Sequence, residues 1–177
     1  MGELSICKIE HPVESGFSCG ITSIDKMAEN SFVLSNLRRC YTYQITGNGV
    51  VLGYYMIMLK RFPIETLKPP LDDYSIGRYE DIYAMHIQYI AIKEEYQHKR
   101  IGSSVLTYII ETVSAMSLEC PFRLLTVDAL DSVVNWYKSF EFKELYREKE
   151  NPETVLMYRD MLSNKELETL DQMTEDV

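Results

Sequence analysis

The sequence is poor in the residues that build metal centres and disulfide frameworks. Its 177 residues include four cysteines, none in a Cys-x-x-Cys pair, and only three histidines. A structural zinc site needs about four clustered Cys or His ligands, so this composition gives no support to a metal centre. Unpaired cysteines favour a reducing compartment. For Cys19, just before Gly20, an idle buried thiol is favoured over a reactive one.

Long apolar runs are also missing. No run reaches the roughly 18 residues that a membrane-spanning helix requires. The opening residues Met-Gly-Glu-Leu-Ser lack the basic region and apolar core of a secretory signal. With 46% hydrophobic and 25% charged residues, the composition is that of a soluble globular protein. We therefore expect a cytoplasmic protein without membrane partners, built as a single domain over residues 1–162 with an acidic helical tail over 163–177.

Positive charge is in deficit. The chain has 18 Lys and Arg against 27 Asp and Glu, and residues 141–177 alone hold 11 acidic and 5 basic side chains. An acidic chain repels phosphate backbones at long range. Nucleic acid is therefore disfavoured as a substrate, and a cationic small-molecule amine or a protein amine fits better.

The hydrophobic pattern predicts a mixed α/β domain. Its order of elements is β-α-β-β-β-α-β-α-β-β. Strands are expected at 4–9, 41–45, 50–59, 82–92, 122–127, 142–147 and 154–159, helices at 22–37, 101–117 and 131–139, and a polar helix from 163. Residues 60–82 show no periodicity and predict a long irregular loop on the acceptor side of the site.

Two local signals accompany this order. Thr22-Ser-Ile-Asp25 is typical of a capping box at the start of the first helix. Gly47-Asn48-Gly49 predicts a tight turn between the second and third strands. The residues of the first helix expected to face the core are Ile24, Met27, Ala28, Leu34 and Leu37.

The segment that points most directly to chemistry is residues 88–108. An apolar strand runs into a polar loop, and the loop into a helix that opens at Ile101-Gly102-Ser103-Ser104. A first turn without bulky side chains leaves backbone N–H groups and the positive end of the helix dipole open to an anion. This order suits a diphosphate-bearing cofactor.

The loop residues Gln97-His98-Lys99-Arg100-Ile101-Gly102 resemble the signature of the GNAT superfamily of N-acetyltransferases. That signature is Gln or Arg, two residues, Gly, one residue, then Gly or Ala, and Arg100 stands where the family usually has its first glycine. In the family, amides of this loop bind the coenzyme A pyrophosphate and the preceding strand pairs with the pantetheine arm. The cofactor-binding residues implied by the resemblance are Ile90, Ala91, Ile92, Gln97, His98, Lys99, Arg100, Ile101, Gly102, Ser103 and Ser104.

A second segment, residues 128–142, is similar to the closing segment of the same family. Tyr137 occupies the position where many members carry the tyrosine that protonates the departing thiolate; the alternative is a core tyrosine at a helix end. Glu141 replaces the glycine of the usual Gly-Phe pair. Asp131 stands where members often have an asparagine that contacts the cofactor, and an N-cap role is equally open.

The N-terminal segments 16–25 and 51–55 are similar to the GNAT-type toxins that acetylate aminoacyl-tRNA. Together the matches cover about residues 15–160. The resemblance implies a GNAT-like acyl-CoA N-acyltransferase fold, with a central twisted mixed sheet flanked by helices. It also implies acetyl-CoA as cosubstrate, no metal, and direct transfer to an amine in a ternary complex.

Several alternatives stay open. His86 and Gln88 share one face of the predicted strand, and His86 has a suitable pKa for a base. A strand histidine is more often packed, so water-mediated deprotonation of the amine is preferred. Arg100 and Glu141 at two glycine positions also allow a non-catalytic acyl-CoA-binding or regulatory protein. The toxin resemblance keeps tRNA open as acceptor, and a homodimer is left open.

Overall fold

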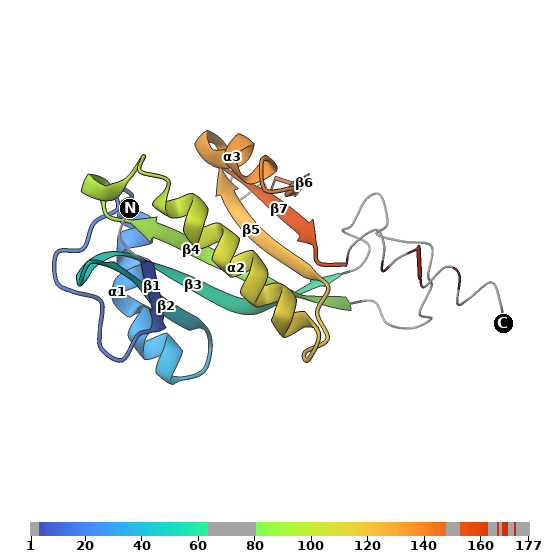
Figure 1. Cartoon of the computed structure of the whole chain (residues 1–177), viewed down its shortest axis with the longest axis horizontal. Helices are drawn as coiled ribbons and strands as arrows, with labels where there is room; N and C mark the ends of the chain where they lie inside the picture. Colours follow the sequence, from blue (N-terminus) through green and yellow to red (C-terminus); the bar gives the residue numbers. More distant parts are fainter. Residues whose placement is uncertain are drawn as a thin grey trace. The chain divides into compact units, whose positions relative to one another are not determined.

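The computed structural model describes residues 4–63, 81–147 and 153–162, together with Glu166, Glu168, Thr169 and Gln172. Its strands are β1 (Leu4–Lys8), β2 (Tyr41–Gly47), β3 (Val50–Pro63), β4 (Asp81–Ile92), β5 (Leu124–Leu130), β6 (Lys143–Tyr146) and β7 (Thr154–Asp160). Its helices are α1 (Thr22–Asn36), α2 (Ile101–Ser117) and α3 (Val134–Lys138), with 3₁₀ turns η2 (Glu94–Tyr96) and η3 (Asp131–Val133) (Figure 1).

In the described residues the strands form one mixed sheet in the order β1-β2-β3-β4-β5-β7-β6. The β1/β2, β2/β3, β5/β7 and β6/β7 pairs are antiparallel. The predicted fold class and the predicted order of helices and strands are confirmed. Asn48 and Gly49 link β2 to β3 with φ of 52° and 77°, as a two-residue hairpin turn requires.

Three strand predictions had limits that were wrong by two residues or more. β2 runs to Gly47, past the predicted end at residue 45. β3 continues to Pro63, past the predicted end at residue 59, because Phe62 is buried beside Ala84. The charged pair at 60–61 hides this continuation from a hydrophobicity pattern. β5 begins at Leu124 and runs to Leu130, where Ala129 pairs with Val155 of β7. The rest of the predicted irregular loop, residues 64–80, lies outside the described residues.

The start of α1 also differs from its prediction. The N-cap is Ile21 and makes no side-chain capping bond, so the predicted capping box is wrong. The Asp25 carboxylate instead accepts hydrogen bonds from the Cys19 N–H at 2.8 Å and from the Ser18 hydroxyl at 3.0 Å. Leu37 is 59% exposed rather than core-facing, because the helix ends at Asn36. The other four predicted core positions of α1 are buried or pack against the core.

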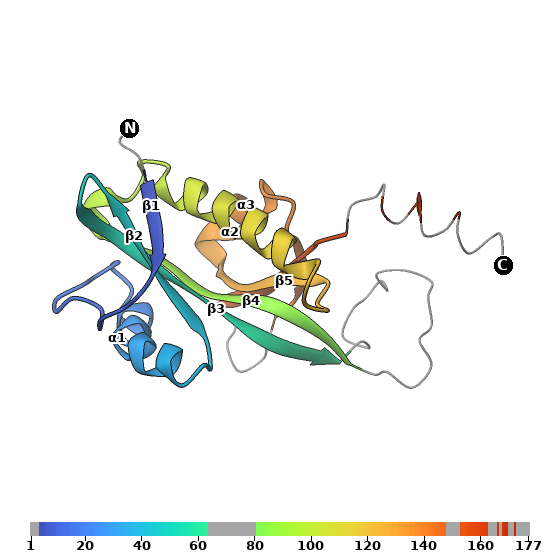
Figure 2. The ribbon, with the colours of Figure 1, turned by 60° about the horizontal axis from the view of Figure 1, so that its bottom comes forward.

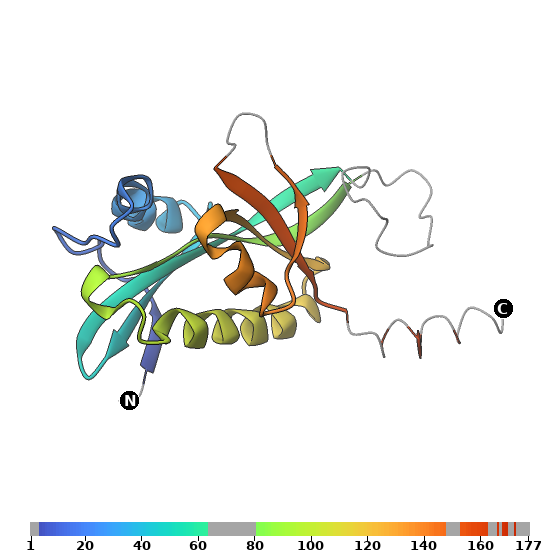
Figure 3. The same cartoon turned by 90° about the horizontal axis from the view of Figure 1, so that it is seen from above.

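The chain divides into two compact units, and the first comprises Met1–Lys60 and Met85–Thr112. In this unit α1 and α2 lie on opposite faces of the strands, as Figures 2 and 3 show. The face toward α1 buries Ala28, Tyr54 and Met56 in one cluster. On the other face Tyr43 stacks on Tyr55, with ring centroids 4.8 Å apart. Both faces of this part of the sheet are therefore covered.

The second unit comprises Arg61–Ala84 and Val113–Val177. Its described core contains Phe62, Ala84, Leu124, Leu156 and Tyr158. Whether residues 1–162 act as a single domain stays a prediction. So does the acidic tail over 163–177, in which the described residues Glu166, Glu168, Thr169 and Gln172 are helical.

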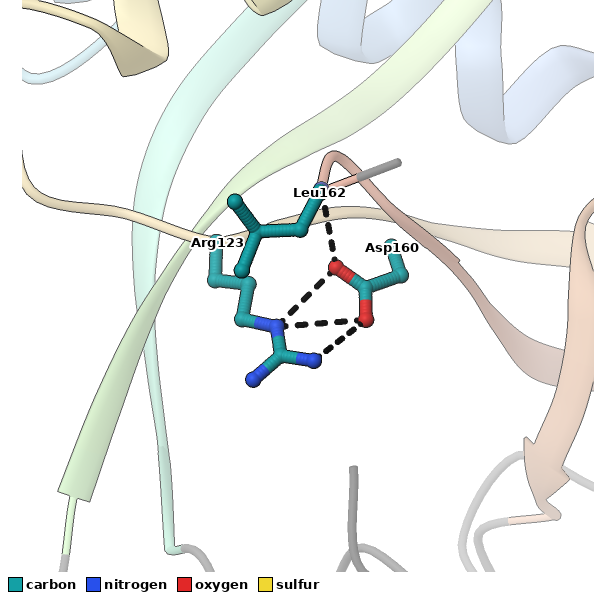
Figure 4. Close-up of polar contacts among 3 residues, drawn as sticks. All are labelled: Arg123, Asp160 and Leu162. Atoms are coloured by element: carbon teal, nitrogen blue, oxygen red, sulfur yellow. Dashed lines mark hydrogen bonds and ion pairs between the residues drawn. The ribbon is translucent and has the colours of Figure 1, made fainter. Parts of the chain in front are cut away.

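Arg123 and Asp160 join the start of β5 to the end of β7 in this unit (Figure 4). Arg123 Nη2 donates to Asp160 Oδ2 at 2.7 Å, and Nε donates to both carboxylate oxygens at 3.0 and 3.1 Å. The Leu162 N–H donates to the same carboxylate at 3.0 Å. Because both side chains are only about 20% exposed, this pair should contribute more to stability than a surface pair.

Replacing Arg123 with alanine should destabilise the protein by about 1–2 kcal/mol, since it leaves the half-buried carboxylate without its charged partner. For a chain of this size we expect the melting temperature to fall by about 3–6 °C. The matched control is Lys138→Ala, which breaks a 2.6 Å pair with Glu144 that is nearly half exposed on both sides. The control should cost less than about 0.5 kcal/mol. Equal shifts in thermal or urea unfolding of the two variants would contradict this assignment.

Candidate functional site

The candidate site begins where β4 ends. β4 stops at Ile92, η2 covers Glu94–Tyr96, and α2 starts at Ile101, the residue predicted. In the intervening loop the Gln97 side-chain nitrogen donates to the carbonyl of Ile92 at 2.9 Å and to that of Cys19 at 2.8 Å. The Gln97 amide group therefore ties the loop to the end of its own strand and to the segment before α1. Its predicted contact with a cofactor stays a prediction.

Two residues of this loop have left-handed backbone. φ is 59° at His98 and 63° at Arg100, and neither is a glycine. Left-handed backbone costs a residue with a side chain roughly 1–2 kcal/mol, and such strain persists only where the surroundings hold it. Arg100 thus adopts a left-handed backbone conformation that glycine takes at lower cost than a residue with a side chain. Left-handed residues in a short loop can orient neighbouring N–H groups into a concave anion-binding surface.

The helix after the loop adds further donors. The Ser104 N–H donates to the Arg100 carbonyl at 3.1 Å, which is the i to i−4 bond that opens α2. The amides of Ile101 and Gly102 precede that bond and have no helical carbonyl four residues back. The Ile101 side chain is 7% exposed and belongs to the core, whereas Gly102, Ser103 and Ser104 are half-buried. Small residues thus surround the positive end of the helix dipole.

The two cations of the loop differ in their contacts. The Lys99 ammonium donates to the Glu95 carbonyl at 2.8 Å and lies 5.2 Å from the centre of the Tyr96 ring. Arg100 is exposed. Lys99 is thus held by its own loop, and Arg100 is the better candidate for reaching a phosphate, to which a guanidinium can bind in bidentate fashion.

Replacing Arg100 with glycine separates charge from backbone strain. If the guanidinium binds phosphate, the lost charge-assisted bonds cost about 1.5–3 kcal/mol of binding free energy. Relief of the left-handed strain stabilises the free and the bound protein alike, so it changes the affinity little. We expect acetyl-CoA affinity to fall about tenfold or more in calorimetry. His98→Gly is the control, because it relieves the strain of a similar φ without removing a permanent charge. This variant should bind acetyl-CoA at least as tightly as the wild type. Tighter binding by Arg100→Gly would remove the arginine from the site.

The strand end before the loop packs closely against β3. A Cβ on Gly53 would lie 2.2 Å from the carbonyl oxygen of Ala91, so only glycine fits there. Ala91 and Ile92 are buried and Ile90 is half-buried, and the predicted pairing of these three with a pantetheine arm stays a prediction. His86 is 1% exposed, which agrees with a packed histidine rather than a solvent-linked base.

Tyr137 lies in α3 and is 5% exposed. Its ring packs edge-on against Trp136 and Phe142, with centroids 4.7 and 5.3 Å away. Burial raises the pKa of Tyr137 above that of an ordinary tyrosine, so its phenol stays protonated at neutral pH. A buried, protonated phenol suits both the predicted general acid and the alternative core role.

The turn after α3 explains how Tyr137 is held. The Phe142 N–H donates to the Tyr137 carbonyl at 3.3 Å and the Glu141 N–H to the Lys138 carbonyl at 3.0 Å. These bonds form a Schellman motif, whose left-handed residue is usually glycine. Here that residue is Glu141, with φ of 66°, and its carboxylate pairs with Arg159 at 2.6 Å. Glu141 therefore takes the left-handed conformation of the glycine it replaces.

Two further candidate residues have local explanations. The N-cap of α3 is Val133 and that of η3 is Leu130, and neither helix has a side-chain capping bond, so the N-cap alternative for Asp131 is wrong. Asp131 instead accepts a hydrogen bond from Arg147, and its cofactor contact stays a prediction. Burial, with a hydrogen bond to Asp25, raises the pKa of the Cys19 thiol to about 12. Cys19 is thus an idle thiol at neutral pH.

Two features beside the loop had no signal in the sequence. Glu14 and Ser18 contact it from the segment before α1. An apolar pocket of about 260 Å³ in the first unit is lined by Leu4, Gly47, Asn48, Val50, Leu52, Tyr96 and Ile101. Both assemble residues from distant parts of the chain, which no local pattern reveals.

Comparison with known proteins identifies the fold. No family model matches the chain, and no curated protein matches it. Among solved structures, a bacterial toxin has TM-score 0.78 at 17% identity, covering 97% of both chains. The chain therefore has the GNAT-like fold that its sequence predicts.

Two further solved structures share that fold. A tyrosine-to-phenylalanine mutant of KacT has TM-score 0.75 at 19% identity, covering 94% of this chain and 98% of that chain. AtaT complexed with acetyl-methionyl-tRNAfMet has TM-score 0.72 at 21% identity, covering 95% of this chain and 99% of that chain. In the part of the chain that the structure describes, no helix is long and apolar enough to cross a membrane, and no group of three or more His, Cys, Asp or Glu is placed to hold a metal ion.

Proposed function

We propose that the protein is an N-acetyltransferase that moves an acetyl group from acetyl-CoA to a primary amine in a ternary complex. The observation that carries the proposal is the loop before α2, where His98 and Arg100 hold left-handed backbone and a helix N-terminus follows at once. Oriented amides of this kind suit a diphosphate, which coenzyme A carries. The AtaTR structure, of similar fold (TM-score 0.73, 22% identity), contains acetyl-CoA.

In this proposal the loop amides and the first turn of α2 hold the diphosphate, with Arg100 adding charge. The strand end at 90–92 holds the pantetheine arm. A thioester is already activated, so the amine attacks it directly and no covalent enzyme intermediate is needed. Positioning of the two reactants can supply much of the rate. Deprotonation of the amine proceeds through water, because the buried His86 is not placed to exchange protons with solvent.

Tyr137 is proposed to give its proton to the departing thiolate. Its buried phenol is the protonated form over the whole neutral range. Apolar surroundings also disfavour the charged thiolate, so they raise the pKa of the leaving thiol and favour its protonation. The two effects together make transfer from phenol to sulfur feasible despite the raised pKa of the phenol.

The direct test is incubation of purified protein with acetyl-CoA and a panel of amines, followed by free thiol release and mass spectrometry of the products. Calorimetry measures acetyl-CoA binding separately. Turnover with an amine supports the enzyme. Binding without turnover would favour a non-catalytic acyl-CoA-binding or regulatory protein. A folded protein that binds no acetyl-CoA would overturn the proposal.

A second candidate function is acetylation of the amine on aminoacyl-tRNA. The similarity to AtaT, solved with acetyl-methionyl-tRNAfMet, favours it, and the net charge of −9 opposes it. AtaT was also solved with the C-terminus of the antitoxin AtaR, so a neutralising protein partner belongs to this candidate. Growth arrest on expression, relieved by Tyr137→Phe, with labelled acetyl recovered on charged tRNA, would select it over a small-molecule or protein amine.

A further inference from the structure

The segment Glu14–Gly20, which we name the brace, is part of the connection from β1 to α1. It contacts the loop between Ile92 and Ile101, which we name the cofactor loop. Glu14 forms an ion pair with Lys93, with Oε1 2.6 Å from Nζ. The Ser18 carbonyl accepts from the Glu94 N–H at 3.4 Å. The single O–H of Ser18 is shared between Asp25 Oδ2 at 3.0 Å and Glu94 Oε1 at 3.1 Å. These contacts lie directly ahead of the left-handed part of the loop.

A further contact comes from Gln97, whose side-chain nitrogen donates to the Cys19 carbonyl of the brace at 2.8 Å. The brace is itself fixed to the body of the first unit. Asp25 of α1 accepts from the Cys19 N–H at 2.8 Å. Phe17 packs edge-on against Tyr54 of β3, with centroids 5.0 Å apart. The brace therefore transmits the rigidity of α1 and β3 to the start of the loop.

This rigidity has a use, because His98 and Arg100 must be kept in a costly conformation. We propose that the brace and Gln97 position the cofactor loop before any ligand arrives, and that Gln97 is a positioning residue rather than a phosphate ligand. The inference rests on the proposed function and deepens it. A loop organised in advance spends less binding energy on ordering itself. Glu14 and Ser18 then contribute to acetyl-CoA affinity without touching acetyl-CoA.

Because Glu14 is negatively charged, the inference can be tested by whether its replacement raises or lowers the affinity for acetyl-CoA. A carboxylate near an anion site repels the anion, so Coulomb's law alone predicts that Glu14→Gln binds acetyl-CoA more tightly. The brace predicts weaker binding, because the ion pair to Lys93 is lost. Glu95→Gln is the matched control: Glu95 lies in η2, two residues after Lys93, and its carbonyl accepts from the Lys99 ammonium, a backbone contact that the substitution keeps.

The experiment is calorimetry of the full-length protein with acetyl-CoA. We expect Glu14→Gln to weaken binding about two- to fivefold, the range for a half-exposed pair. Glu95→Gln should bind as the wild type or slightly more tightly. Gln97→Leu, which loses two hydrogen bonds, should bind about three- to tenfold more weakly. Glu14→Gln binding as tightly as Glu95→Gln would overturn the inference.

Hydrogen–deuterium exchange supplies a readout that needs no ligand. Amides of residues 98–103 should exchange faster in Glu14→Gln than in the wild type or in Glu95→Gln, while the amides of β3 keep their protection. If the wild type binds no acetyl-CoA, the proposed function fails. Hydrogen–deuterium exchange alone then tests whether the brace positions the cofactor loop. Unchanged exchange in Glu14→Gln would overturn it. The Glu14 side chain is 40% exposed, so its replacement should leave folding intact.

Discussion

Tyr137→Phe should lower kcat by roughly 10²–10⁴ and leave acetyl-CoA affinity almost unchanged, as expected for the loss of a general acid. The substitution removes only the hydroxyl. The ring that packs between Trp136 and Phe142 is kept, and so are the backbone bonds of the Schellman motif that holds it. The effect should therefore lie in catalysis and not in folding. Steady-state kinetics, calorimetry and thermal unfolding measure the three quantities separately.

Tyr158→Phe is the matched control for this prediction. Tyr158 is another buried tyrosine of the second unit, 8% exposed, in the core cluster with Phe62 and Leu124. Loss of its hydroxyl should leave kcat within about twofold of the wild type. Full activity in Tyr137→Phe would show that water or the substrate protonates the thiolate, and Tyr137 would then be a core residue of α3.

The pH dependence of the wild type follows from the direction of the Tyr137 pKa. The acid form of the phenol is the active one, and burial raises its pKa above the ordinary tyrosine value near 10. The alkaline fall in kcat that belongs to this group should therefore begin at higher pH than an unperturbed tyrosine would give. The variant should lack that fall entirely. An alkaline fall that persists in Tyr137→Phe would belong to another group.

The sequence was sufficient to predict the elements whose signals are local. The apolar face and small first turn of α2 predicted both of its ends, 101 and 117. Gly47-Asn48-Gly49 predicted the hairpin turn, in which Asn48 and Gly49 form the link and Gly47 belongs to β2. The order of strands and helices, and with it the mixed α/β class, followed from such signals, whereas the GNAT-like fold was implied by the family resemblance of residues 88–108 and 128–142. The candidate anion site could be located for the same reason, because strand, loop and helix start are contiguous in the chain.

Features that depend on tertiary contacts could not be predicted. Glycine is expected wherever φ is positive, yet Arg100 and Glu141 adopt φ of 63° and 66°. The motif predicts that Gln97 contacts the cofactor, whereas one acceptor of its side-chain amide is the carbonyl of Cys19, 78 residues earlier in the chain. Asp25 fits a capping box by spacing, but the Cys19 N–H and Ser18 hydroxyl occupy its carboxylate. For Gln97 and Glu141 the partner is distant in the chain, Cys19 and Arg159 respectively. For Asp25 the partners lie six and seven residues before it, outside the helix that the spacing describes.

Gly102→Val should weaken acetyl-CoA binding tenfold or more, about 1.4 kcal/mol or above. Gly102 follows Ile101 in the first turn of α2, where its amide precedes the opening bond from Ser104 to Arg100. A β-branched side chain there would stand where the diphosphate must approach the backbone. Ser114→Val on the same helix is the control for the lower helix propensity of valine, and Ser114 is exposed. If both variants fold and bind acetyl-CoA equally well, the first turn of α2 does not hold the diphosphate, and the anion site must be sought elsewhere.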